Sequence, residues 1–362
     1  FRAARVLVES SEVRGAANVH IEGIETERGP VIVGEPGEPL TISLRYPPYA
    51  DGQLGFDALP SLLHARSVED VDRALELWVE PVNVVQAADT RGGLLHRVAG
   101  RVPRRAPDNR LRVVPGWDPR YAWQPGAEPL PRAHVDDVSV MANERGLAAT
   151  LGLEFAPDHR ERRIRFLLEQ QMAWAPADMP ALHMDTELRS AQALLLCLPP
   201  LTDLSADATA LRARLLSWDR RMDADSQDAA SFARVRSSVV RKFARHPALA
   251  SLASLTADPT PYPALFHPWL DLTARVAFAL EFLLTSERLP TIDRAALVRS
   301  ALEEVAREPS AERWSERHRI APWQALPSGD AAWPGVAGDH DCVLSTSAVP
   351  GWTCPVSYTH LR

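Results

Sequence analysis

The chain has almost no lysine: Lys242 is the only one, and the other 39 of its 40 basic residues are arginine. Acidic residues outnumber basic ones, and the formal net charge is −7. The densest basic segment, Arg160 to Arg165, is interrupted by Glu161 and by an apolar residue, as on a solvated helix face. Nucleic-acid-binding proteins instead gather their basic residues on one face or stripe. The sequence therefore predicts no nucleic-acid partner.

Long apolar segments are also missing. The apolar run from Ala193 to Leu198 stops at Pro199 and Pro200, whereas a helix that spans a bilayer needs about 20 apolar residues. We therefore predict no transmembrane segment. Nothing in the sequence shows export, so the cellular compartment stays open. With 46% hydrophobic and 24% charged residues, the composition is typical of a globular protein.

Cysteine is scarce, and the histidines do not fall at metal-site spacings. Of the three cysteines, Cys342 and Cys354 could pair in an oxidising compartment, although the sequence alone does not determine the pairing. Cys197, in a leucine-rich segment, is expected to be a small buried hydrophobic residue. Four histidines invite a metal or triad interpretation but lack zinc-site spacing, and we expect core or surface roles for them: His64, His96, His183 and His318.

The first part of the chain has the pattern of β-structure with a pair of helices. Strands are predicted at Arg5–Val13, Ala17–Glu25, Gly29–Val33, Thr41–Arg45, Val82–Ala88 and Leu94–Val98. The turn signals Arg14-Gly15-Ala16 and Asp89 to Gly93 predict two hairpins. Apolar spacing between Asp57 and Trp78 favours two helices, the second capped by Ser67. Alternation at Val138, Val140 and Ala142 predicts a last strand that runs toward Asn143.

From Pro157 to about Arg307 the apolar spacing becomes that of helices. The predicted buried stripes are Ile164, Leu167, Leu168 and Gln171; Leu211, Leu215, Trp218 and Met222; and Val276 to Leu284. The stretch after Trp314 is expected to return to loops and strands. The predicted organisation is a β-rich part at 1–148, a helical region at 149–310 and a return toward the core at 311–355. Residues 356–362 match a translated sequencing adapter and are excluded from this interpretation.

Several short segments occur in an order that is typical of one family. They are Phe56-Asp57-Ala58-Leu59 with Ala65-Arg66-Ser67, Pro81-Val82-Asn83, Gly100 to Arg105, Ala142-Asn143, Leu215 to Asp219, and Trp314 with His318. Each is weak alone, but together they resemble the β-subunit of the penicillin acylase (penicillin amidase) family of N-terminal-nucleophile hydrolases. The chain departs from the family pattern at Glu144, where members often carry asparagine, and at Ser315, which replaces a glycine.

The resemblance implies an α+β fold: part of the αββα sandwich of these hydrolases, with a large helical elaboration. In the family, a self-processing proenzyme exposes a serine as the first residue of the β-subunit, and the α-amino group of that serine acts as its base. The Ser-Asn-x-Trp string that marks this serine in the family is not found in this chain. The resemblance therefore implies a fragment that is inactive alone, with the α-subunit and the N-terminal part of the β-subunit as its missing partners.

Two site residues follow from the resemblance. Asn143 falls where the family keeps the asparagine of its oxyanion hole; the alternative is a turn residue, because Ala-Asn-Glu-Arg-Gly is an ordinary exit from a strand. Arg160 resembles an arginine that supports this asparagine. Its alternative is a solvent-facing arginine in the first turn of a helix, and Arg162 or Arg163 could be confused with it.

The function implied is an acylase that hydrolyses a linear amide of a small molecule. No cofactor is expected for the chemistry; family members commonly bind a structural calcium, whose ligands are not identified in this chain. The substrate stays open, because members cleave penicillins, glutaryl-cephalosporins, acyl-homoserine lactones and lipopeptides, and members are often periplasmic or secreted. The alternatives are a catalytically inactive relative with a binding or structural role, and an unrelated α+β protein.

Overall fold

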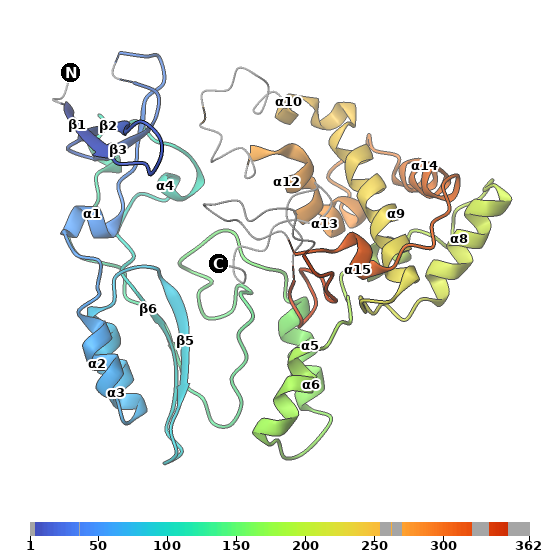
Figure 1. Cartoon of the computed structure of the whole chain (residues 1–362), viewed down its shortest axis with the longest axis horizontal. Helices are drawn as coiled ribbons and strands as arrows, with labels where there is room; N and C mark the ends of the chain where they lie inside the picture. The colour runs from blue at the N-terminus through green and yellow to red at the C-terminus, as the bar shows by residue number, and fades with distance from the viewer. Residues whose placement is uncertain (1–3, 36, 254–261, 263–269, 321–332, 347–362) are drawn as a thin grey trace. The chain divides into compact units, whose positions relative to one another are not determined.

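The computed structural model describes residues 4–35, 37–253, 262, 270–320 and 333–346 (Figure 1). The chain divides into two compact units, Phe1–Asp158 and His159–Arg362. The strands lie in the first unit and most of the helices in the second, which confirms the α+β prediction. The structural division falls after Asp158, whereas the predicted end of the β-rich part is residue 148.

The first unit opens with a four-stranded antiparallel sheet in the order β1-β2-β3-β4. Its strands are β1 (Ala4–Ser11), β2 (Val19–Thr26), β3 (Gly29–Val33) and β4 (Ile42–Ser43). The predicted hairpin between the first two strands is confirmed, and Ala4 pairs with Thr26 at its open end. The short helix α1 (Pro47–Asp51) follows.

A second sheet, in the order β5-β6-β7, follows a helix pair. The elements are α2 (Ala58–His64), α3 (Val68–Ala74), the 3₁₀ turn η1 (Leu75–Leu77), β5 (Asn83–Ala88), β6 (Leu94–Ala99), α4 (Asp108–Leu111), η2 (Pro119–Tyr121) and β7 (Arg132–Ala133). Ser67 caps α3 as predicted, since its side chain accepts from the Asp70 N–H at 3.2 Å. The Asp89 carboxylate closes the hairpin by accepting from the N–H groups of Arg91 and Gly93 at 2.9 and 3.0 Å.

The predicted strand at Val138, Val140 and Ala142 is wrong. Val140 and Ala142 are buried, but the segment is irregular, and β5 and β7 are the strands that pair with β6. The segment is attached through side chains instead of a strand ladder. Ser139 Oγ accepts from the Gln86 side-chain amide at 2.5 Å and lies 2.8 Å from Nδ1 of His96. Val140 and Ala142 thus alternate in burial with their neighbours, as in a strand, although this segment has no strand pairing among the described residues.

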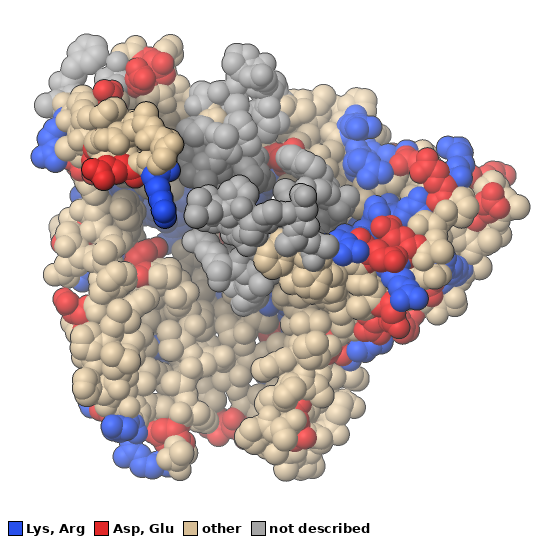
Figure 2. Space-filling model, in the orientation of Figure 1, with Lys and Arg blue, Asp and Glu red and all other residues tan. Residues whose placement is uncertain are grey.

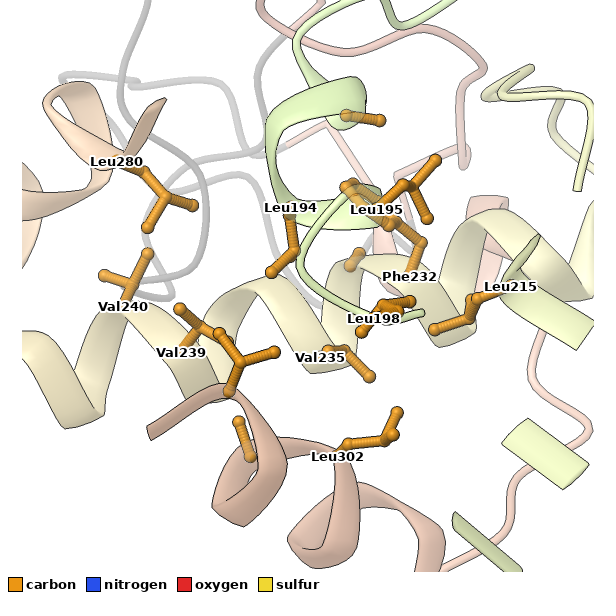
Figure 3. Close-up of a cluster of buried hydrophobic side chains, with 14 of the residues drawn as sticks. Leu194, Leu195, Leu198, Leu215, Phe232, Val235, Val239, Val240, Leu280 and Leu302 are labelled. Atoms are coloured by element: carbon orange, nitrogen blue, oxygen red, sulfur yellow. The ribbon is translucent and has the colours of Figure 1, made fainter. Parts of the chain in front are cut away.

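The second unit is helical. Its elements are α5 (His159–Leu168), η3 (Pro176–Asp178), α6 (Met179–His183), α7 (Ala191–Leu195), α8 (Ala206–Ser217), α9 (Gln227–Ala244), η4 (Pro247–Leu249), α10 (Ala250–Ala253), α12 (Leu272–Phe278), α13 (Leu280–Thr285), α14 (Arg294–Ala306) and α15 (Trp314–Arg317). Figure 3 shows the core around α9, where Phe232, Val235 and Val239 meet leucines of α7, α8 and α14. Burial of these side chains is the main stabilising contribution of the unit.

The predicted buried stripes agree with this core in two of three cases. Leu215, Trp218 and Met222 are buried, and so are Val276 and Leu280, although their stripe is divided between α12 and α13. On α5 the predicted helix forms, but its stripe is only half-buried at Ile164, Leu167 and Leu168, and Gln171 is exposed. The buried residues of α5 are the arginines Arg160 and Arg163, so the prediction that the basic run is a solvated face is wrong for these two.

On the face in Figure 2, basic and acidic side chains of the helical unit are intermixed and do not form a patch of one sign. No helix among the described residues is long and apolar enough to cross a membrane.

One side chain of the second unit should make its stability depend on pH. His318 is buried, its ring stacks on Trp314 with centroids 4.5 Å apart, and its Nε2 lies 3.1 Å from Thr346 Oγ1. Burial lowers the pKa of His318; the charge of Asp339 raises it and that of Arg236 lowers it, and the net direction is down.

An unfolded histidine titrates near pH 6.5, so below that pH the unfolded chain binds more protons than the folded one. Stability should therefore fall as the pH drops from about 7 toward the folded pKa of His318, by at most about 1.4 kcal/mol per pH unit for one site. Urea unfolding between pH 7 and 5 measures this slope, and His318→Gln should flatten it. An equally steep slope in the variant would contradict the assignment.

Candidate active site

Asn143 lies in a tight turn of the first unit, between the irregular segment 138–142 and the loop that leads to Asp158. Its φ of 67° is left-handed, a conformation that asparagine adopts more readily than most residues. Its carbonyl accepts from the Ala156 N–H at 3.0 Å, and Glu144 forms a parallel bridge with Ala156. Asn143 itself is exposed, but the residues on either side of it, Ala142 and Glu144, are buried.

Glu144 holds this turn from inside, a role that the sequence did not predict. Its side chain reaches back past Asn143, and Oε2 accepts from the Ala142 N–H at 2.7 Å. Gly146 leaves space for the carboxylate, because a Cβ added at Gly146 would lie 2.9 Å from Glu144 Oε1. The only sequence signal was the departure from the family pattern at this position, which does not by itself indicate a role.

Ser139 lies four residues before Asn143 in the sequence, and His96 lies on β6. The 2.8 Å between Ser139 Oγ and His96 Nδ1 is a distance found in nucleophile–base pairs. The Gln86 amide donates to Ser139 Oγ, so the Ser139 hydroxyl is directed to donate to His96 Nδ1. Burial lowers the pKa of His96, while the charge of Glu144 raises it; the net direction is down, which favours the neutral ring. Within the described part of the chain, His96 Nε2 is buried without a hydrogen-bond partner, so no third group there orients the ring as in a catalytic triad. We interpret the pair as the anchor of the segment that leads to Asn143.

Arg160 lies in the second unit, in the first turn of α5, and is 7% exposed. The alternative of a solvent-facing arginine is therefore wrong. Its position relative to Asn143 is not defined, because the two residues belong to different units. The supporting role of Arg160 stays a prediction.

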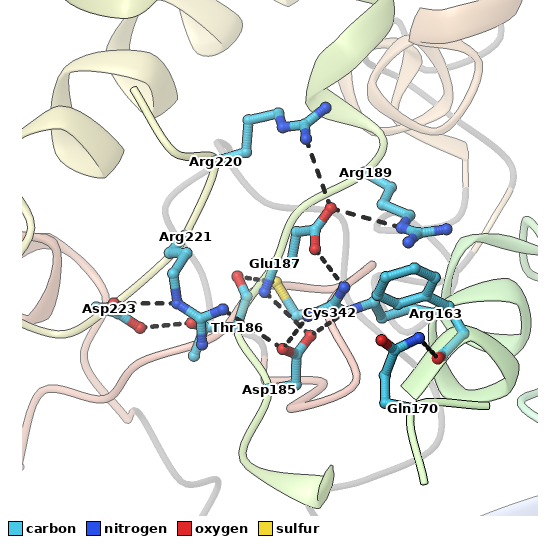
Figure 4. Close-up of polar contacts among 11 residues, drawn as sticks. Arg163, Gln170, Asp185, Thr186, Glu187, Arg189, Arg220, Arg221, Asp223 and Cys342 are labelled. Atoms are coloured by element: carbon cyan, nitrogen blue, oxygen red, sulfur yellow. Dashed lines mark hydrogen bonds and ion pairs between the residues drawn. The ribbon is translucent and has the colours of Figure 1, made fainter. Parts of the chain in front are cut away.

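Arg163, one helical turn further along α5, is the centre of a buried ionic cluster (Figure 4). Its guanidinium donates twice to Asp185, at 2.9 and 2.7 Å, and lies 2.6 Å from a Glu187 carboxylate oxygen. Arg221 also reaches Asp185, at 3.5 Å. Although burial raises the pKa of Asp185, the hydrogen bonds and charge of Arg163 outweigh it and hold that pKa below its usual value. The cluster fixes α5, the helix that carries Arg160, to the segment 185–187.

The remaining candidate residues have structural surroundings. His64 Nδ1 lies 2.7 Å from the Pro60 carbonyl on the surface, and His183 is exposed at the end of α6. The buried Cys342 thiol donates to the Thr186 carbonyl at 3.2 Å, and burial raises its pKa well above the usual value. Cys354, with which it could pair in an oxidising compartment, lies outside the described residues, as does the tail 356–362.

Cys197 is half-buried against the helical core, so the prediction of a buried small residue is close to the structure. Among the described residues there is no group of three His, Cys, Asp or Glu side chains that could hold a metal ion.

Comparison with a solved structure and with a family model places the chain. The fold matches a thermostable penicillin G acylase from Alcaligenes faecalis with a TM-score of 0.62 and 16% identity, over 86% of this chain and 63% of that one. The chain therefore shares the fold of that enzyme. The model of the penicillin amidase family matches residues 1–359. The chain belongs to the penicillin amidase family, as the ordered motifs predicted.

Two curated relatives carry the comparison further. The chain is 30% identical to the penicillin acylase 2 proenzyme of Pseudomonas sp. (strain SE83) in an alignment of length 361 that covers 93% of this chain and 46% of that protein. It is 30% identical to the acyl-homoserine lactone acylase QuiP of Pseudomonas putida in an alignment of length 169 that covers 44% of this chain and 20% of that protein. The chain thus spans less than half the length of either relative, and the two relatives are named for different substrates.

Proposed function

We propose that the complete protein is an acylase that hydrolyses a linear amide through an N-terminal serine, and that Asn143 donates to the oxyanion. The serine hydroxyl attacks the amide carbonyl, the amine leaves with a proton, and water then releases the carboxylic acid from the acyl-enzyme. Family membership over residues 1–359 supports this reaction. Because no Ser-Asn-x-Trp string occurs in these 362 residues, the nucleophile is assigned to a part of the protein outside this sequence.

One observation carries the role of Asn143: an exposed asparagine in a left-handed turn, between two buried neighbours, at the position where the family resemblance expects the oxyanion donor. A side-chain amide donates two hydrogens and does not change charge with pH. A donor held in place before the reaction stabilises the negative charge of the tetrahedral intermediate without reorganising. The turn supplies that rigidity through the Ala156 and Glu144 hydrogen bonds.

The first hairpin supports further protein partners, which we propose to be the α-subunit and the N-terminal part of the β-subunit. Val6 and Val8 lie on one face of the hairpin, and Val19 and Ile21 lie on the other. All four are between 49% and 63% exposed. We assign these exposed apolar side chains, two on each face of the hairpin, to contacts with those partners.

The proposal is tested by expressing the complete gene and assaying a panel of linear amides, including a penicillin and an acyl-homoserine lactone. We expect one amine and one carboxylic acid for each amide cleaved, and a mature subunit whose N-terminal sequence begins with serine followed by Asn-x-Trp. The 362-residue chain alone should be inactive. A complete protein that lacks this serine and cleaves nothing in the panel would favour the alternative, an inactive relative with a binding or structural role.

A further inference from the structure

The side chain of Glu144 closes a small hydrogen-bonded loop that contains Asn143. Its Oε2 accepts from the N–H of Ala142, so the residue before Asn143 is tied to the side chain of the residue after it. On the other side, the Asn143 carbonyl is tied to the Ala156 N–H, and Glu144 pairs with Ala156 in a parallel bridge. The hydrogen bond to Ala142 and the bridge to Ala156, which includes the Asn143 carbonyl, constrain one residue whose φ, 67°, is unfavourable for most side chains.

We propose that Glu144 is a positioning residue for Asn143: its buried carboxylate maintains the left-handed turn that presents the Asn143 amide to the reacting carbonyl. This inference rests on the proposed role of Asn143 as oxyanion donor. Glu144 acts through the Ala142 N–H and does not contact the substrate. It accepts one hydrogen bond, and no proton transfer is assigned to it.

Side-chain length makes the assignment specific. A glutamate at this position reaches the N–H two residues back, and an aspartate is one methylene shorter. Gly146 leaves room for the carboxylate, because a Cβ at that position would lie 2.9 Å from Oε1. The hydrogen bond from Ala142 needs an acceptor oxygen on a side chain as long as glutamate, but it does not need a negative charge. A negative charge there would oppose a nearby oxyanion. Glutamine should therefore replace Glu144, whereas aspartate and alanine should not.

The experiment is a double-mutant cycle in the complete enzyme, with kcat and KM measured separately. Because a displacement of about 1 Å can cost about 10²-fold in rate, Glu144→Ala should lower kcat by about 10- to 100-fold with little change in KM. Glu144→Asp should lower kcat in the same way, and Glu144→Gln should stay within about threefold of wild type. In an Asn143→Gly background, Glu144→Ala should lower kcat by no more than about twofold, because the amide that Glu144 positions is gone.

The outcomes separate the two proposals. If Asn143→Gly leaves kcat unchanged, the role of Asn143 as donor fails. If Asn143→Gly lowers kcat but Glu144→Ala lowers it by its full factor again in that background, the positioning role of Glu144 is overturned. If Glu144→Ala does not fold, Glu144→Asp and Glu144→Gln decide alone. A retained kcat in Glu144→Gln with a lowered kcat in Glu144→Asp supports the inference. An equal loss of kcat in both variants overturns it.

Discussion

Replacing Asn143 by glycine in the complete enzyme is expected to lower kcat by about 10²- to 10³-fold, because one oxyanion donor contributes about 3–4 kcal/mol to transition-state stabilisation. Glycine is the informative substitution, since it adopts the left-handed φ of 67° without strain, whereas alanine would add a backbone cost of about 1–2 kcal/mol. KM should change little, because the interaction forms with the oxyanion and not with the bound ground state.

Two further variants sharpen this test. Aspartate has the shape of asparagine and also adopts this backbone conformation, but it replaces the amide donor by a negatively charged acceptor. Asn143→Asp should therefore lower kcat at least as much as Asn143→Gly does. Asp203→Gly is the matched control, because Asp203 is another non-glycine residue at positive φ, 56°, in the helical unit; it should leave kcat unchanged. Activity in Asn143→Gly close to wild type would remove Asn143 from the mechanism.

The elements whose signals are local were predictable from the sequence. The turn at Arg14-Gly15-Ala16, the Ser67 cap and the spacing of Leu215 and Trp218 each depend on neighbours in the chain, and each is confirmed. The prediction of a strand at Val138 is wrong because the contacts that hold this segment are not local in the sequence. Its alternation matched a strand, but its neighbours are the Gln86 and His96 side chains, far away in the sequence.

The candidate site divides in the same way. Asn143 could be proposed only through the family resemblance, because a turn asparagine alone is unremarkable in sequence. Glu144 and Arg163 could not be predicted, since a glutamate in a turn and an arginine on a basic helix ordinarily face solvent. What distinguishes Arg163 is the pair Asp185 and Glu187, about 20 residues further along, and no helical periodicity indicates that contact.

Replacing Arg163 by alanine is expected to destabilise the helical unit by up to about 3–5 kcal/mol, because it removes the bidentate partner of the buried Asp185 and the nearest cation of Glu187. The other cations are less closely placed: Arg221 is 3.5 Å from Asp185, and Arg189 and Arg220 are 3.5 and 3.7 Å from Glu187. In the folded protein the side chains of Arg163 and Asp185 are only 10% and 7% exposed, and their two hydrogen bonds form a bidentate pair. Denaturant unfolding followed by circular dichroism measures the loss.

Arg165→Ala is the matched control on the same helix. Arg165 also pairs with a carboxylate, Glu161, but its side chain is 50% exposed, so its loss should be below about 1 kcal/mol. The double variant Arg163→Met with Asp185→Leu should be far less destabilised than the sum of the single changes Arg163→Ala and Asp185→Ala, because it leaves neither half of the pair buried alone. Equal losses for Arg163→Ala and Arg165→Ala would mean that burial does not set the strength of these ion pairs. The attachment of α5, and with it the support for Arg160, would then have to come from apolar packing.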